Sequence, residues 1–376
     1  MIRQEYTEKE KVPAITSIGK GNPIRVVTVD DSALIRLTLN RYLKQFPDIE
    51  VVGQASNGQE MLALVKTVRP DVVVLDVEMP VMNGIEALER LMRSCPLPVI
   101  MLSNLTRSGA EVTLQALELG AIDFVVKPQP GVTMAETVDL LVGKIRQAAT
   151  AKVQIYSVNQ RIELNSNEFG QTGSYMEHSH GKRISALQPG DRLLVVASST
   201  GGPSALTAFL SALPAGLPLG GVIIQHMPVG FTTILGQRLN RIGGYAVTEA
   251  ITGSRLMRGQ FLIAPGGYHL TFDNLGVAVL NEEPAVNGVR PAADVTFRSL
   301  AQHFGPQITA VVLTGMGNDG FAGALEIHRQ GGRILAQDEK SSVVFGMPRR
   351  IVESHLAEYV SSPEMLAVYA AQQVTV

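Results

Sequence analysis

Residues 193–203 read Leu-Leu-Val-Val-Ala-Ser-Ser-Thr-Gly-Gly-Pro. The apolar beginning indicates a buried strand, the small residues indicate a sharp turn, and Pro203 suits the first turn of a helix. A serine at such a junction projects from the carboxyl edge of a sheet, beside the main-chain N–H groups that begin the helix. The stretch therefore predicts a nucleophilic serine, or else a glycine-rich turn that binds phosphate or only joins strand to helix.

Composition sets the limits for any function. The chain has 376 residues, 45% hydrophobic and 18% charged, which is typical of a globular protein with two or three domains. A net charge of −2 gives no basic footprint for nucleic acid. The single Cys95 excludes an internal disulfide and a cysteine-rich zinc cluster. The polar first residues and the lack of a long apolar run predict a cytoplasmic protein that is not inserted in a membrane.

The first half of the chain predicts a doubly wound α/β domain. Residues 1–22 are polar and are expected to form an extension, and the domain is expected over residues 23–146. Within it, short apolar runs alternate with stretches of helical periodicity, which is typical of a parallel sheet covered by helices. The five runs are residues 24–30, 50–55, 71–77, 98–103 and 123–127.

Polar residues follow four of these runs, at the strand ends where such folds place their function. They are Asp30 and Asp31, Asp76 and Glu78, Ser103, and Lys127. Carboxylates that converge at one edge repel each other without a cation, and oxygen ligands favour Mg²⁺. An aspartate beside Mg²⁺ can accept a phosphoryl group, whose charge a lysine can neutralise and whose oxygens a hydroxyl can contact. Each acid alone could be a helix cap, but the whole set favours a phosphoryl-accepting site.

Residues 24–145 resemble a response-regulator receiver domain over their whole length. The resemblance implies that Asp76 is the phospho-acceptor and that a histidine kinase is the phosphodonor. It also implies a set of magnesium ligands, with Glu78 contributing its backbone carbonyl, and a set of switch residues. The ligands would be Asp30, Asp31, Asp76 and Glu78, and the switch residues Ser103, Phe124 and Lys127.

Residues 147–188 lose this periodicity and are predicted to be a flexible linker. His178 and His180 lie two positions apart, a spacing that could hold a metal ion. Because the segment is polar and offers no third ligand nearby, we interpret them as a solvated pair.

Strand–helix alternation returns in residues 189–376 and predicts a second α/β domain. Ser199, His226 and Asp319 each follow an apolar run, so parallel strands would bring them to one edge. A histidine that takes the serine proton, itself held by an aspartate, makes the hydroxyl nucleophilic. The N–H of Thr200 and one from the Met316 loop could then bind the oxyanion. Each of these residues could instead have a purely structural role. His269 is a rival candidate for the base, and it could also line a substrate groove.

This second half resembles the catalytic domain of chemotaxis protein-glutamate methylesterases. The resemblance implies Ser199 as nucleophile, His226 as base and Asp319 as its orienting acid, with no cofactor for the ester reaction. Such enzymes hydrolyse γ-glutamyl methyl esters on methyl-accepting chemotaxis receptors, and many deamidate receptor glutamines. The matching stretches are residues 199–202, 225–228, 264–266, 288–291, 314–320 and 344–348.

One departure concerns the residues before the nucleophile. The family's usual Ile-Gly-Ala is Val-Ala-Ser at positions 196–198, which places a second hydroxyl, that of Ser198, beside Ser199. The alternative function is a response regulator whose C-terminal domain only binds a partner. A DNA-binding regulator is less favoured, because neither the charge nor the α/β alternation supplies a basic helix-turn-helix.

Overall fold

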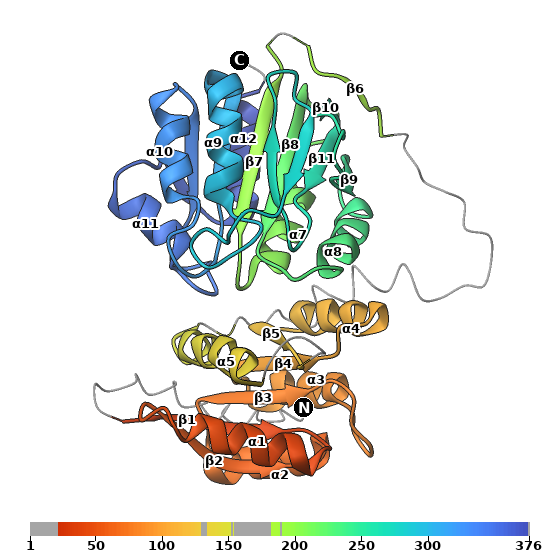
Figure 1. Ribbon diagram of the computed structural model, residues 1–376, viewed down its shortest axis with the longest axis vertical. Coiled ribbons are helices and arrows are strands. Elements are labelled where there is room, and N and C mark those ends of the chain that lie inside the picture. Colours follow the sequence, from red (N-terminus) through yellow and green to blue (C-terminus); the bar gives the residue numbers. More distant parts are fainter. Residues whose placement is uncertain (1–21, 129–133, 152, 154–181, 189, 375–376) are drawn as a thin grey trace, which may run out of the picture.

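The computed structural model describes residues 22–128, 134–151, 153, 182–188 and 190–374. Two α/β domains follow one another along the chain and pack together, the N-terminal one below the C-terminal one in Figure 1. The predicted N-terminal extension and the histidine pair at 178 and 180 lie outside the described residues. In the part of the chain that is described, no helix is long and apolar enough to cross a membrane.

The N-terminal domain is a five-stranded parallel sheet in the order β2-β1-β3-β4-β5. Alternate residues of the buried strands face opposite layers, so Val26 packs toward α1 and α5 whereas Val27 packs toward α2, α3 and α4. The strands are β1 (Ile24–Val29), β2 (Ile49–Ala55), β3 (Val72–Asp76), β4 (Val99–Ser103) and β5 (Asp123–Val126). The helices are α1 (Ala33–Leu43), α2 (Gly58–Val68), α3 (Gly84–Ser94), α4 (Arg107–Glu118) and α5 (Met134–Ala148).

The C-terminal domain is built on a seven-stranded parallel sheet in the order β16-β15-β14-β7-β8-β11-β9. Helices α7, α8 and α12 cover one face, and α9, α10 and α11 cover the other. The strands are β7 (Arg192–Ser198), β8 (Leu219–Gln225), β9 (Ala246–Glu249), β11 (Gln260–Ile263), β14 (Ile308–Val312), β15 (Arg333–Gln337) and β16 (Tyr359–Ser361). The helices are α7 (Gly202–Ala212), α8 (Phe231–Asn240), α9 (Ala293–Phe304), α10 (Phe321–Arg329), α11 (Met347–Glu353) and α12 (Pro363–Gln372).

Both domains confirm the predicted doubly wound fold, with differences at the linker. Helix α5 ends at Ala148, so the expected boundary at residue 146 falls inside its last turn. Strand β6 (Ser185–Ala186), expected to be linker, pairs with β10 (Met257–Arg258). A two-residue strand is too short to show a periodic pattern, which is why the sequence did not reveal it. An antiparallel hairpin, β12 (His269–Phe272) with β13 (Ala278–Asn281), lies outside the main sheet.

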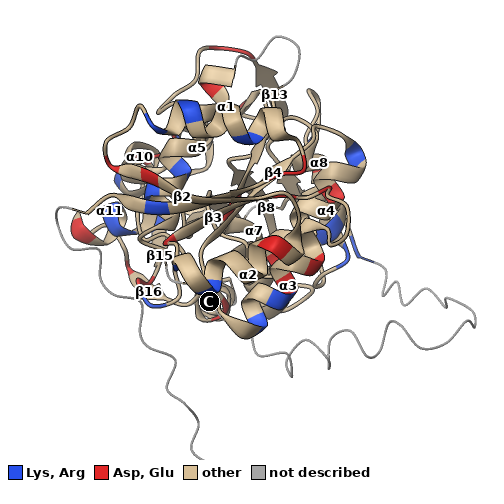
Figure 2. Cartoon of the chain, turned by 90° about the horizontal axis from the view of Figure 1, so that it is seen from below, with Lys and Arg blue, Asp and Glu red and all other residues tan. Residues whose placement is uncertain are grey.

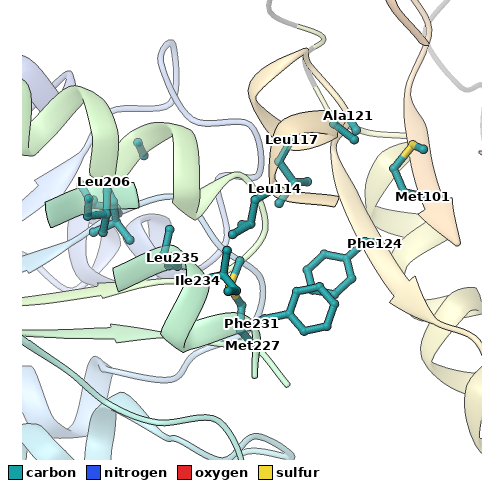
Figure 3. Close-up of a cluster of buried hydrophobic side chains, with 14 of the residues drawn as sticks. Met101, Leu114, Leu117, Ala121, Phe124, Leu206, Met227, Phe231, Ile234 and Leu235 are labelled. Atoms are coloured by element: carbon teal, nitrogen blue, oxygen red, sulfur yellow. The ribbon is translucent and has the colours of Figure 1, made fainter. Parts of the chain in front are cut away.

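The two domains share one continuous hydrophobic cluster. Leu114 and Leu117 of α4 lie opposite Ile234 and Leu235 of α8 (Figure 3). Beside them the rings of Phe124, in β5, and Phe231, at the start of α8, stack with centroids 4.5 Å apart. At the rim, Arg238 Nη1 donates to Glu118 Oε1 over 2.7 Å, and Arg238 Nη2 donates to the Glu111 carbonyl oxygen.

Charged residues are distributed without a broad basic face on the side seen in Figure 2. Along α3 two acidic residues precede two basic ones, α4 carries both kinds, and the charged residue of α8 is Arg238.

Candidate functional site

The turn after β7 presents Ser199 as the sequence predicts. Gly201 adopts φ +76°, which an L side chain rarely tolerates, and Gly202 begins α7 with Pro203 in its first turn. A Cβ at Gly202 would lie 1.9 Å from the Gln225 side-chain oxygen, so this position requires glycine. Ser199 is partly exposed, whereas Ser198 before it is fully buried. The bend therefore brings only one of the two hydroxyls to the surface.

His226 and Asp319 meet at the same sheet edge. His226 follows β8, Asp319 lies in the loop after β14, and the His226 Nε2 to Asp319 Oδ2 distance is 2.7 Å. This contact uses Nε2, so Nδ1 is the ring nitrogen left to take a proton. Among the described residues no hydrogen bond joins Ser199 to the His226 ring, and such contacts commonly tighten only when substrate binds.

Asp319 is held by several donors. The N–H groups of Ala293 and Asp294, at the start of α9, donate to Oδ2 and Oδ1 over 2.6 and 3.1 Å, and Asn287 Nδ2 donates to Oδ1 over 3.2 Å. Burial alone would raise the pKa of Asp319. The hydrogen bond from His226, the charge of that ring and the two N–H groups of α9 outweigh burial and lower it. Asp319 thus stays ionised beside the histidine.

Asn287 and Asp294 are site residues that sequence reasoning missed. Asn287 Nδ2 lies 3.0 Å from Asp294 Oδ2 as well as near Asp319, so one amide bridges two buried carboxylates. Burial, together with the neighbouring Asp319 charge, raises the pKa of Asp294. The residue type gave a weak signal: Asn287 precedes Gly288 and has φ +55°, a conformation that asparagine tolerates better than most residues.

The main chain of Thr200 and Met316 fits the predicted oxyanion site. A peptide group is planar and trans, so its C=O and its N–H point in opposite directions. The Gly315 carbonyl accepts from the N–H groups of Gly346 and Met347 over 3.1 and 2.8 Å, which directs the Met316 N–H away from them. A Cβ on Gly315 would lie 2.7 Å from the Ser199 Cβ, so this loop lies against the serine. Among the described residues, neither the Thr200 N–H nor the Met316 N–H has a hydrogen-bond acceptor.

The structure gives His269 a different role from the one expected. Its ring is 1% exposed; Nε2 lies 3.2 Å from the Pro284 carbonyl oxygen, and the Ala292 N–H donates to Nδ1 over 3.3 Å. Both ring nitrogens therefore hold the loop that carries Asn287, and neither is left for a base or a substrate contact. The sequence placed His269 near the site correctly but could not show which way the ring faces.

The predicted phosphoryl-accepting residues also come together. Lys127 Nζ lies 2.8 Å from both Asp30 Oδ2 and Asp76 Oδ2. Carboxylate oxygens of Asp30, Asp31 and Asp76 lie within 4.8 Å of one another, and Asp31 is exposed. This compact, all-oxygen set at an open edge fits Mg²⁺. The Glu78 side chain points to Asn104, whose Nδ2 donates to it over 3.1 Å, which leaves only its carbonyl as the ligand that the resemblance implies.

Charge and burial oppose each other at this edge. Burial raises the pKa of Asp76 to about 6, and the charge of Asp30 adds to the rise, although Lys127 opposes it. Burial would lower the pKa of Lys127, but its bonds to Asp30 and Asp76 raise it instead.

Of the three expected switch residues, Lys127 lies at this edge, whereas Ser103 and Phe124 contact elements of the domain interface. Ser103 is buried, with its hydroxyl 2.6 Å from the Thr113 hydroxyl of α4. Phe124 is 4% exposed and stacks on Phe231. Asp123, one residue earlier, accepts hydrogen bonds from the Thr200 hydroxyl and, over 2.6 Å, from Lys144 Nζ. The receiver therefore touches the residue next to the serine.

We expect the pKa of Asp76 to appear in the pH dependence of stability in metal-free buffer. A carboxyl whose pKa is about 6 in the folded protein binds its proton more tightly there than in the unfolded chain. Its protonation therefore adds ~1–3 kcal/mol to the free energy of unfolding below pH ~4, and this stabilisation is lost as the pH rises through 6. Calorimetry with a chelator should show Asp76→Asn raising the unfolding temperature more at pH 7.5 than at pH 5. An equal effect at both values would contradict this.

We expect Asn287→Gly to slow covalent labelling of Ser199 by a phosphonate about tenfold. Glycine keeps the positive φ but removes a hydrogen bond to an ionised carboxylate, worth ~1.5 kcal/mol. Labelling rates measured by mass spectrometry test this, with Asn274→Gly, in an exposed turn remote from Asp319, as the matched control. Equal rates for the two variants would show that Asn287 does not support the site.

Comparison with known proteins finds two family domains in this chain. A CheB methylesterase family model matches residues 194–369, and a response regulator receiver domain model matches residues 26–139. Curated relatives named protein-glutamate methylesterase/protein-glutamine glutaminase occur in Pyrococcus abyssi (41% identity over 90% of both chains) and Symbiobacterium thermophilum (42% identity over 90% of this chain and 93% of that one).

Solved structures match each half separately. The methylesterase catalytic domain of Thermotoga maritima CheB is 37% identical, with a TM-score of 0.48, over 49% of this chain and 99% of that one. The response regulator domain of Thermotoga maritima CheB is 42% identical, with a TM-score of 0.33, over 35% of this chain and 99% of that one. The identity to full-length relatives shows that this chain belongs to the protein-glutamate methylesterase/protein-glutamine glutaminase family, with a receiver domain followed by a CheB methylesterase domain.

Proposed function

We propose that this protein is a cytoplasmic, phosphorylation-gated hydrolase of γ-glutamyl methyl esters on methyl-accepting chemotaxis receptors, and that it also deamidates selected receptor glutamines. The observation that carries the proposal is the 2.7 Å contact between His226 and Asp319 at the sheet edge where Ser199 leaves its strand. Family membership supports the substrate class, because the relatives bear both activities in their names.

In this mechanism Ser199 Oγ attacks the γ-carbonyl carbon while His226 Nδ1 takes its proton. Asp319 stabilises the imidazolium that forms and fixes the ring orientation. The N–H groups of Thr200 and Met316 donate hydrogen bonds to the oxyanion that develops on the carbonyl oxygen. When the tetrahedral intermediate collapses, the proton passes to the leaving oxygen and methanol departs, leaving a glutamyl ester on the serine.

Water completes the cycle by the same steps. His226 takes a proton from water, the resulting hydroxide attacks the glutamyl ester, and the proton returns to Ser199 Oγ as glutamate is released. A glutamine side chain enters the same route with ammonia as the leaving group. One acyl-enzyme therefore serves both reactions.

The receiver domain supplies the control. Mg²⁺ bound by Asp30, Asp31 and Asp76 would neutralise the charge of an incoming phosphoryl group, which Asp76 accepts from a histidine kinase. Lys127 pairs with the new charge, and Ser103 contacts its oxygens. Because Ser103 and Phe124 lie between Asp76 and the interface, their rearrangement weakens the contacts that hold the receiver against Thr200.

Methanol release from methylated receptor membranes tests the activity. With Mg²⁺ and a small phosphodonor, the full-length protein should release methanol faster than without them, and Ser199→Ala should abolish release, because the serine forms the acyl intermediate. A wild-type protein that releases no methanol, and whose Ser199 no phosphonate labels, would favour the non-catalytic partner-binding alternative.

We expect Phe231→Leu to raise the basal rate of the unphosphorylated protein about twofold to tenfold. The substitution removes an aromatic pair worth ~0.5–1.5 kcal/mol that holds the inhibited arrangement. The phosphodonor-activated rate should stay unchanged. Tyr359→Leu, which breaks the remote Tyr359–Tyr369 stack, is the matched control. Gating through this contact would be contradicted by an unchanged basal rate. It would also be contradicted by an activated rate that changes by the same factor as the basal rate.

A further inference from the structure

The buried Gln225 side chain joins the two reacting residues of neighbouring strands. Gln225 is the last residue of β8, is 1% exposed, and lies opposite Ser198 in the parallel register. Its Nε2 donates to the Ser199 carbonyl oxygen over 2.9 Å and to the His226 carbonyl oxygen over 3.2 Å. Both amide hydrogens are thus used, one on the main chain of the nucleophile and one on that of the base.

The neighbouring Ser198 satisfies the other end of this amide. With both N–H groups facing carbonyl oxygens, Gln225 Oε1 needs a donor, and the Ser198 hydroxyl donates to it over 2.6 Å. An unsatisfied buried oxygen would favour other side-chain conformations. The second hydroxyl beside the nucleophile is therefore not a spare nucleophile: it is fully buried and committed to Gln225.

The Ser199 carbonyl that Gln225 holds belongs to the same peptide group as the Thr200 N–H. That carbonyl also accepts from the Gly202 N–H over 2.8 Å, so two donors fix it toward the protein interior. Because the group is planar and trans, the Thr200 N–H must point the opposite way. The Thr200 N–H has no acceptor among the described residues, as an oxyanion donor requires.

We propose that Gln225, oriented by Ser198, is a positioning residue for the acyl-transfer reaction: it fixes the peptide group that supplies the Thr200 oxyanion donor and ties it to the His226 main chain. Gly202 is glycine because a side chain there would displace Gln225. The inference rests on the proposed esterase function. It accounts for the serine at position 198, where the resemblance gives alanine as the family's usual residue.

Three variants of the full-length, phosphodonor-activated protein test the proposal. Gln225→Met keeps the length of the side chain but cannot donate a hydrogen bond. It should lower kcat for methanol release about 10- to 100-fold with KM unchanged, because an oxyanion donor stabilises only the transition state, and the substitution misaligns that donor. Ser198→Ala should lower kcat by a smaller factor, about threefold to tenfold. In the Gln225→Met background Ser198→Ala should have no further effect, because the two residues act as one unit.

A pH profile separates positioning from general damage to the fold. In Gln225→Glu an ionised carboxylate would face two carbonyl oxygens, whereas the neutral acid can donate to one of them. The ratio of variant to wild-type kcat should therefore rise as the pH falls. The matched control is Gln260→Met, on the adjacent strand β11, whose side chain donates to the Thr248 hydroxyl; this substitution should leave kcat unchanged.

Phosphonate labelling keeps this inference distinct from the proposed function. Labelling of Ser199 in Gln225→Met should reach one label per chain, as in wild type, but at a rate reduced by a similar factor. A wild-type rate in Gln225→Met, or additive effects of the two substitutions, would overturn the inference. Normal labelling of wild type without methanol release would instead count against the proposed receptor substrate, while the labelling rates of the variants would still decide the role of Gln225.

Discussion

Parallel strand pairing is the constraint on which both sites depend. In a parallel sheet every strand ends at the same edge, so residues far apart in the chain meet wherever neighbouring strands stop. Ser199 and His226 follow the paired strands β7 and β8, and β14, which leads to Asp319, lies on the other side of β7. The same rule gathers Asp30, Asp76 and Lys127 in the receiver. Two parallel sheets of different strand order thus use the same edge for two different sites.

The two sheet edges place buried acids in opposite electrostatic environments. Asp319 is buried, but the hydrogen bond and charge of His226 and two helix N–H groups outweigh burial and lower its pKa. Asp76 has one lysine and a second carboxylate nearby, so burial prevails and its pKa rises to about 6. The difference fits the proposed roles. One acid must stay charged beside a histidine, whereas the other lies in a site whose excess negative charge calls for a cation.

The contact between the domains links these environments. Phe124 and Phe231 stack in a cluster that includes α4 and α8, and Asp123 beside Phe124 accepts from the Thr200 hydroxyl. A stacked ring pair tolerates little displacement, because dispersion contacts fall off steeply with distance. In the proposed gating, a change in the receiver would reach the residue next to Ser199 through this direct contact.

Local patterns in the sequence predicted much of the fold. Apolar runs predicted the five strands of the first sheet to within one or two residues, because burial imposes its pattern directly on the chain. They missed β9 and β16, the short edge strands of the second sheet, and the two-residue pairing of β6 with β10, where few residues are buried.

The sequence by itself determined the two α/β domains and which residue types stand at the strand ends, since these follow from periodicity and local motif. Only the tertiary structure decided which way side chains face. In the folded chain the His269 ring faces the Pro284 loop, Asn287 donates a hydrogen bond to Asp319, and Ser198 donates one to Gln225. These partners lie 15 to 32 positions apart in the chain, and hydrogen bonds over such separations form only once the strands and loops are packed together.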